Sequence, residues 1–279
     1  MWHCRCFVLL FAGFIETSVG QSIPSVRPFD VSKIPVDRLT PDLLNLTVII
    51  VFVILFLRTA APSVNSRYLK HLAGAYALIG LFYLSSILLV QYKLILFFSA
   101  QGQEYQVDAL FKELDKVGEL IKLIFSSLSS CFLLLTWYLL RHYPKQGISR
   151  TFYGSVFTAY CIAIPAIIGV AQVFEWQSVV VLNVTDSVFA FIGVLMVGFG
   201  LCQLIWHQKE LSGPVRDIAT LLVAIAFLCW ALPQPLYESH QGYVWFWVLL
   251  AIGKVIAGLA AILVSVAVLK AKPGFQGSE

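Results

Sequence analysis

The stretch that decides the fold covers residues 244–269, which read VWFWVLLAIGKVIAGLAAILVSVAVL. One charged residue, Lys254, interrupts 26 otherwise uncharged and mostly apolar positions. A helix needs roughly 20 such residues to cross the hydrocarbon core of a bilayer. The stretch therefore predicts a transmembrane helix, and lipid rather than water as its solvent.

Six further apolar stretches precede it, at residues 43–57, 72–90, 123–140, 152–174, 188–205 and 218–232. Charged residues make up only 12% of the chain, whereas a soluble domain carries about a quarter. None of the stretches alternates as a barrel strand does. We therefore expect an all-α, polytopic membrane protein with a seven-helix bundle in residues 42–270.

The N-terminus has the layout of a secretory signal peptide over residues 1–20. Arg5 precedes the apolar run 7–14, and small residues at 18–20 offer a cleavage site. A retained anchor, which would be an eighth helix, is the alternative. Residues 21–41 contain four prolines, which favours an extended extracytoplasmic segment.

Charge alternates between the loops and predicts the orientation. One set of loops carries ten Lys and Arg against three acids, and the other set seven against eleven. The positive-inside rule puts the N-terminus outside and the tail, 271–279, in the cytosol. We expect a multi-pass protein of the secretory pathway or plasma membrane. The basic residues are then membrane anchors, and no nucleic acid partner is expected.

Several outer features follow from this topology. Asn45-Leu-Thr and Asn183-Val-Thr are possible glycosylation sites. Tyr243, Trp245 and Trp247 predict an interfacial aromatic belt. Residues 108–122 carry apolar side chains every three or four positions, which indicates an amphipathic helix that extends the third span outward. This extension is either an ordinary solvated helix end or a lid or partner-binding surface.

Small residues predict where helices approach closely. Gly193, Gly198 and Gly200 lie in one span, Gly253 in the last, and Ser130 in a seam of small polar residues within 123–140. Small side chains let backbones meet where lipid offers no hydrophobic driving force. We interpret these seams as packing surfaces, with a polar conduit as the alternative.

Lys254 is the most informative single residue. A charged lysine in mid-membrane costs about 2.5–3.5 kcal/mol on insertion scales, so it should face the bundle and be paired. Its partners could be helix carbonyls or a serine, or it could contact an ion or substrate. A lysine amine shielded from water can also form a Schiff base with a carbonyl ligand.

Lys254 in the last span and Trp230-Ala-Leu-Pro233 in the one before it resemble the retinal-linking lysine and pocket wall of rhodopsins. The resemblance implies retinal as a cofactor held by Lys254 beside Trp230. The chain departs from that pattern at Leu250, where microbial rhodopsins keep an aspartate, and in 123–140, which has no carboxylate. Lys254, Trp230 and Ser130 are the candidate ligand-binding residues.

The sequence contains no catalytic motif, and its histidines lack the spacing of a metal site. We therefore expect a protein that is not an enzyme. The first hypothesis is a receptor- or sensor-like protein with a small apolar ligand and an unknown cytoplasmic partner. The second is a small transporter or channel subunit that uses Lys254 at the midplane. A retinal photoreceptor is the third.

Overall fold

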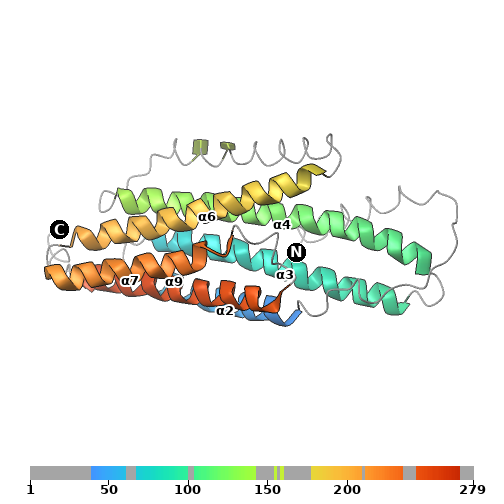
Figure 1. Ribbon diagram of the computed structural model, residues 1–279, viewed down its shortest axis with the longest axis horizontal. Coiled ribbons are helices and arrows are strands. Elements are labelled where there is room, and N and C mark those ends of the chain that lie inside the picture. The colour runs from blue at the N-terminus through green and yellow to red at the C-terminus, as the bar shows by residue number, and fades with distance from the viewer. Residues whose placement is uncertain are drawn as a thin grey trace, which may run out of the picture.

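The structure is a computed structural model that describes residues 39–60, 67–99, 104–142, 154–155, 158–159, 177–208, 211–234 and 243–270. Within those ranges it has six long helices and no strand. They are α2 (Leu39–Ala60), α3 (Arg67–Ser99), α4 (Glu104–Arg141), α6 (Gln177–Trp206), α7 (Gly213–Ala231) and α9 (Val244–Lys270). All six lie along one long axis of an elongated bundle (Figure 1).

Five of these helices are long and apolar enough to cross a membrane. They are α2, α3, residues Ala109–Arg141 of α4, α7, and residues Trp245–Val268 of α9. Residues Ala190–Trp206 of α6 form a shorter apolar helix. The chain is therefore an all-α, multi-pass integral membrane protein. Of the predicted elements, the signal peptide, the tail and almost all of span 152–174 lie outside the described residues.

The N-terminal boundary of α2 differs from the expectation. Residues 39–41 were expected to be extended because of Pro41, but they form the first turn of α2. Proline is tolerated there because the first turn of a helix needs no backbone N–H donor for its own hydrogen bonds. Asp42, which was expected to precede the first span, consequently lies inside the same helix as Asn45.

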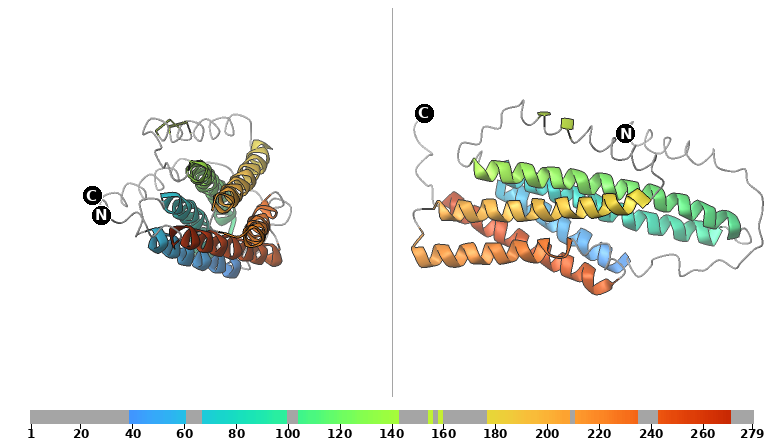
Figure 2. Two further views of the ribbon diagram at one scale, coloured as in Figure 1. Left: turned by 90° about the vertical axis from the view of Figure 1, so that its left-hand side faces the viewer. Right: turned by 45° about the horizontal axis from the view of Figure 1, so that its top comes forward.

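Contacts between helices fix their directions. Gly193 and Gly200 of α6 lie against Leu133 and Leu140 of α4, so these two helices run parallel. The same comparison makes α2 parallel to α9, since Asn45 bonds to Trp247 and Gly258 faces Phe52. α3 and α7 run the opposite way (Figure 2).

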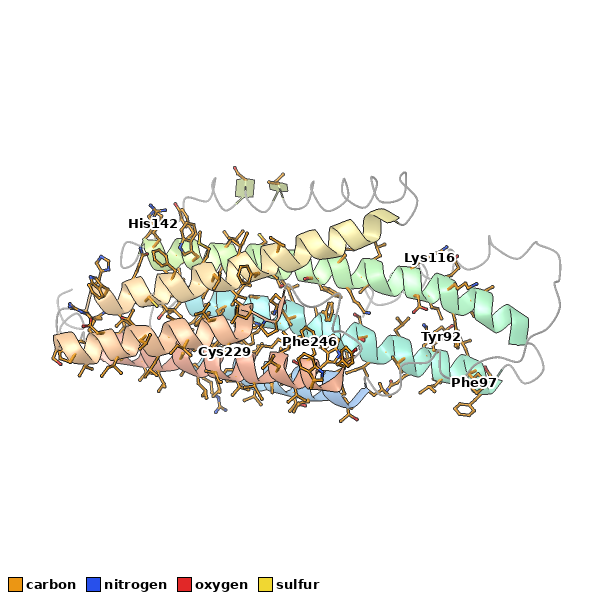
Figure 3. The ribbon with its side chains drawn as sticks, viewed as in Figure 1. Tyr92, Phe97, Lys116, His142, Cys229 and Phe246 are labelled. Carbon is orange, nitrogen blue, oxygen red and sulfur yellow. The ribbon has the colours of Figure 1, made fainter. Side chains whose placement is uncertain are left out.

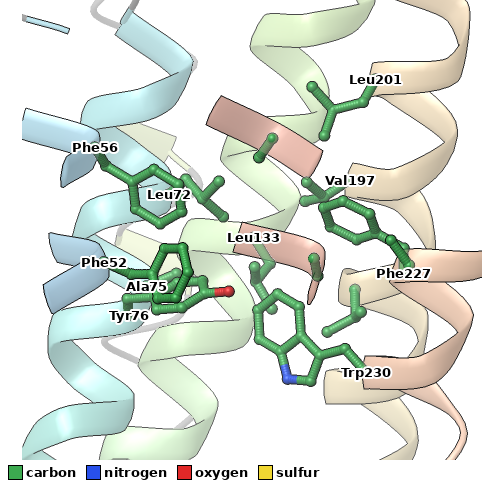
Figure 4. Packing of buried hydrophobic residues seen from close by; sticks show 14 of the residues in the cluster. Phe52, Phe56, Leu72, Ala75, Tyr76, Leu133, Val197, Leu201, Phe227 and Trp230 are labelled. Carbon is green, nitrogen blue, oxygen red and sulfur yellow. The ribbon is translucent and has the colours of Figure 1, made fainter. Parts of the chain in front are cut away.

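Aromatic rings fill the middle of the bundle. Phe52 and Phe56 of α2, Tyr76 of α3, and Phe227 and Trp230 of α7 converge there (Figure 4). The ring of Tyr76 lies 5.1 Å from that of Phe56 and 5.2 Å from that of Trp230. This cluster joins three helices at the depth where the candidate site lies.

Glycines allow the remaining helices to close around this core. A Cβ on Gly253 would lie 2.6 Å from the carbonyl oxygen of Cys229, so the backbones of α9 and α7 are in direct contact. A Cβ on Gly198 would lie 2.6 Å from the Phe227 side chain, so this glycine lets α6 pack directly on Phe227 of α7. The interpretation of these small residues as packing surfaces agrees with this geometry.

The C-terminal part of α3 and the N-terminal part of α4 lie side by side as a pair, which we call the hairpin, and project beyond the other helices (Figure 3). α3 continues nine residues past the predicted end of its span, and α4 runs unbroken from Glu104 through the third apolar stretch. Phe111 and Leu114 of α4 pack on Val90 of α3. Lys93 is buried between the carboxylate of Asp115 and the ring of Phe111.

Candidate functional site

Lys254 lies inside the bundle, with 2% of its surface exposed. Its Nζ donates hydrogen bonds to Oδ1 of Asn45 on α2, at 2.8 Å, and to the hydroxyl of Tyr83 on α3, at 2.7 Å. The same nitrogen lies 4.5 Å from the centre of the Tyr83 ring. The expectation that Lys254 faces the bundle and is paired therefore holds, but its partners are an amide and a phenol rather than a helix carbonyl or a serine.

Asn45 is held so that its oxygen faces the lysine. Its Nδ2 donates to the carbonyl oxygens of Pro41, at 2.9 Å, and Trp247, at 3.1 Å. Because both amide hydrogens are used, Oδ1 is left to accept from Lys254. Trp247 also packs edge-on against Tyr83, with ring centres 6.0 Å apart. This packing buries Trp247, so it is not part of the predicted lipid-facing belt.

Asp42 supplies a negative charge to the same centre. It is buried in the first turn of α2, three residues before Asn45, which accepts the hydrogen bond from Lys254. A carboxylate is also favoured at this position because the N-terminus of a helix carries a partial positive charge. Asp42 is one of the eleven acids that the charge count assigns to the outer loops, and the structure corrects this by burying it within α2. We call Lys254, Asn45, Tyr83 and Asp42 the lysine centre.

Three tyrosines on one face of α3 bind α9. Tyr83 contacts Nζ of Lys254, and the Tyr76 hydroxyl donates to the Lys254 carbonyl oxygen at 3.0 Å. The Tyr68 hydroxyl donates to Oγ of Ser265 at 2.7 Å. Their spacing of eight and seven residues is a helical-face pattern that the sequence analysis overlooked. This spacing was the available signal for the contact between α3 and α9.

The three candidate ligand-binding residues separate into two places. The Trp230 ring contacts the ring of Tyr76, and the Tyr76 hydroxyl donates to the carbonyl oxygen of Lys254. Trp230 therefore lies next to the lysine centre. Ser130 instead lies on α4 where Gly193 of α6 packs, and its hydroxyl donates to the Ser126 carbonyl at 3.1 Å. Ser130 thus belongs to the contact between α4 and α6.

The two glycosylation candidates also differ. Asn45 is fully buried and hydrogen-bonded to Lys254, a position incompatible with a glycan. The cause is the packing of α2 on α9, which turns Asn45 toward the bundle while Thr47 of the same sequon stays exposed. Asn183 lies within α6, and its side chain is outside the described residues.

Comparison with protein-family models, curated proteins and solved structures found no match. The site is therefore interpreted from its own chemistry. It combines an ammonium, a carboxylate, an amide and a phenol inside a membrane bundle. Such a group can hold three helices together, receive a polar ligand, or exchange a proton along its hydrogen bonds.

Proposed function

We propose that the chain is a receptor- or sensor-like membrane protein in which the lysine centre holds the resting arrangement of α2, α3 and α9. The observation that carries this proposal is the pair of hydrogen bonds from Lys254 to two different helices. A ligand that competes for one of these bonds would favour a second arrangement of the three helices. A single buried cation that joins three helices can act as the contact that such a ligand would break.

The parallel course of α4 and α6 supports a count of seven spans. Two helices of the same direction require an odd number of crossings between them, and the apolar stretch 152–174 would supply one. Together with the six described helices, this gives the seven-helix bundle proposed here. The orientation with the N-terminus outside rests on the charges of the loops.

The depth of the lysine centre suggests an approach from the outer side. Lys254 is ten residues from Val244, which is about 15 Å along the helix, and Asn45 is about 9 Å from Leu39. Both helices begin at the end that we assign to the outside. A small, largely apolar ligand from that side would have the shorter path to the aromatic rings of Tyr83 and Trp247.

Proximity labelling from the C-terminus of the full chain tests the proposal. We expect Lys254→Met to change the set of cytoplasmic proteins that are labelled, because it removes the bonds that hold the resting state. Ser130→Ala, a buried polar change outside the lysine centre, should leave the set unchanged. An identical set for the native chain and Lys254→Met would contradict the receptor-like function.

A transporter or channel is the second candidate, and the buried Lys254–Asp42 charges favour it, since charges inside a membrane often mark ion pathways. The test uses proteoliposomes loaded with a pH-sensitive dye. A proton flux that is present in the native chain and lost in Lys254→Met would support transport over reception.

The third candidate, a retinal pigment, is tested separately with all-trans retinal. A Schiff base requires the Lys254 amine to exchange its bonds to Asn45 and Tyr83 for a bond to the aldehyde carbon, with loss of water. A visible absorbance band that disappears in Lys254→Ala would support the pigment. No band, or a band that survives the substitution, would end that hypothesis.

A further inference from the structure

The apolar contacts that hold the hairpin together also include the start of α2. We call them the hairpin cluster; it consists of Val90 on α3 and of Phe111 and Leu114 on α4. Leu39, the first residue of α2, packs against this cluster. Among the described residues, no side chain of α9 belongs to the cluster or packs against it. The hairpin cluster therefore joins α2, α3 and α4, whereas Lys254 stands on a fourth helix.

A short chain of contacts along α2 links Leu39 to Lys254. The carbonyl oxygen of Pro41, in the same first turn as Leu39, accepts a hydrogen bond from Nδ2 of Asn45 at 2.9 Å. Oδ1 of the same side chain accepts from Nζ of Lys254 at 2.8 Å. Because both bonds belong to one amide group, a movement of the first turn changes where Oδ1 points. The position of Leu39 therefore affects the acceptor of the lysine bond.

The second acceptor of Lys254 is connected to the hairpin cluster through α3. Tyr83, whose hydroxyl accepts from Lys254 at 2.7 Å, lies seven residues before Val90, which is about 10 Å along the helix. Seven residues make nearly two full turns, so both side chains lie on one face of α3, and both are buried. Beyond Val90, Lys93 forms its ion pair with Asp115 of α4. Both acceptors of the lysine bonds thus lie on helices that contact the hairpin cluster.

We propose that the hairpin regulates the lysine centre: a displacement of the hairpin cluster moves α2 and α3 relative to α9 and breaks the bonds from Lys254 to Asn45 and Tyr83. A small displacement is sufficient. The two bonds are 2.8 and 2.7 Å long, and a separation of about 3.6 Å is no longer a hydrogen bond, so a shift of about 1 Å removes either one. Packed helices shift by about 1–2 Å in allosteric transitions.

The inference deepens the proposed function and rests on it, because it names the part of the chain that acts on the resting arrangement of α2, α3 and α9. The hairpin projects beyond the other helices, so a change there can reach Lys254 without opening the bundle (Figure 3). Coupling between two sites is reciprocal. The state of Lys254 should therefore affect the hairpin as well, and both directions can be measured.

Nitrogen-15 NMR of the full chain in lipid nanodiscs, with only its lysines labelled, tests the direction from the hairpin to the lysine centre. The Nζ signals of the buried Lys93 and Lys254 are assigned by their loss in Lys93→Met and Lys254→Met. Asp115→Ala should shift the Lys254 signal by more than its linewidth, because it loosens the hairpin. Glu113→Ala, which breaks the exposed ion pair with Lys116 within α4, is the matched control and should leave that signal unchanged. If Asp115→Ala shifts the Lys93 signal but not that of Lys254, the proposal is wrong.

The same measurement tests the link through α2. Leu39→Ala removes most of the side chain that joins α2 to the hairpin cluster, so it should reduce the shift of the Lys254 signal that Asp115→Ala causes. Leu44→Ala, at an exposed position of the same helix, is the control and should leave that shift at its full size. An equal shift in the Leu39→Ala and Leu44→Ala chains would refute the link through α2.

Hydrogen exchange tests the reverse direction. Lys254→Met should speed exchange in residues 104–118 of the hairpin at least about fivefold, whereas Ser130→Ala should not. A native exchange rate of these residues in Lys254→Met would overturn the proposal. Neither measurement depends on the cytoplasmic output of the protein. If the coupling is observed but proximity labelling finds the same proteins for the native chain and Lys254→Met, only the receptor-like function is contradicted.

Discussion

Lys254→Met removes the ammonium that donates to the Asn45 oxygen and the Tyr83 hydroxyl, and it leaves the buried Asp42 carboxylate without that positive charge. Removing one member of a buried charged group costs about 3–5 kcal/mol of folding stability. We expect a loss of that size in denaturant unfolding of the chain in lipid bicelles. Ser130→Ala is the control and should cost less than about 1 kcal/mol, because that hydroxyl bonds only weakly within its own helix.

Asp42→Asn combined with Lys254→Met tests whether the two charges interact. Once the lysine is absent, the buried carboxylate is a penalty, so its removal should restore part of the stability lost in Lys254→Met. The same unfolding experiment measures all four members of the double-mutant cycle. If the losses of the two single variants simply add, Asp42 is not a partner of Lys254.

Thr47→Ala tests whether Asn45 carries a glycan or is only a buried, hydrogen-bonded residue. It destroys the sequon but removes only an exposed hydroxyl that bonds to the Leu43 carbonyl at 2.8 Å. We expect its gel mobility to equal that of the native chain, with and without glycosidase. Asn45→Ala should instead lower stability, because it removes the acceptor of the Lys254 bond. A mobility increase in Thr47→Ala would show that Asn45 carries a glycan.

The sequence could predict that Lys254 is buried and paired, because the cost of a charge in lipid depends on that residue alone. It could not predict the partners. Asn45 is 209 positions away, and its Asn-Leu-Thr context indicates a surface sequon equally well. Asp42 precedes the apolar stretch 43–57 and so resembles a loop acid. Only the packing of α2 against α9 brings these residues together.

At the scale of the helix, Gly253→Ala should force α7 and α9 apart. The new Cβ would lie 2.6 Å from the Cys229 carbonyl oxygen and 2.8 Å from the Trp230 Cα, and neither backbone atom can rotate away. Such overpacking costs about 1–3 kcal/mol. Gly213→Ala, where nothing lies within 4 Å of the new Cβ, should be neutral or stabilise by up to about 1 kcal/mol. Equal melting temperatures for the two variants would contradict this packing.

Removing either partner of the Lys93–Asp115 ion pair should affect the stability of the α3–α4 hairpin by different amounts. Lys93 is buried and Asp115 is 59% exposed, so Asp115→Ala leaves a buried charge, while Lys93→Met replaces that charge by an apolar side chain of similar length. We expect faster hydrogen exchange in residues 90–118 for Asp115→Ala, by roughly tenfold. Lys93→Met should exchange at nearly the native rate. The reverse order would mean that the ion pair does not hold the hairpin.

The elements themselves were largely predictable, since six of the seven apolar stretches correspond to described helices, and the seventh, 152–174, lies almost entirely outside the described residues. Their ends were not. The length of α3 beyond residue 90 depends on Lys93, which the charge pattern assigns to a loop but which α4 covers. The start of α2 depends on whether Pro41 ends an extended segment or opens a helix, and both are allowed by its backbone.

At the scale of the whole molecule, the helix termini gather at two opposite ends of the bundle. Ala60, Arg67, Arg141, Trp206 and Gly213 lie at one end, and Leu39, Ser99, Glu104 and Val244 lie at the other (Figure 1). The first end carries Arg58, Arg141 and Arg216, and Arg216 lies 4.5 Å over the ring of Trp206. A basic rim with an adjacent tryptophan is typical of the cytoplasmic interface.

This assignment predicts the accessibility of single cysteines in a chain whose native cysteines are replaced. His142→Cys and His207→Cys, both exposed at the basic end, should react with a membrane-impermeant maleimide only after the cells are permeabilised. Ser99→Cys, exposed on the projecting hairpin, should react in intact cells. Reaction of His142→Cys in intact cells would mean that the orientation of the bundle is the reverse of the one proposed. The lysine centre would then lie nearer the cytosol, and an intracellular ligand would replace the external one proposed here.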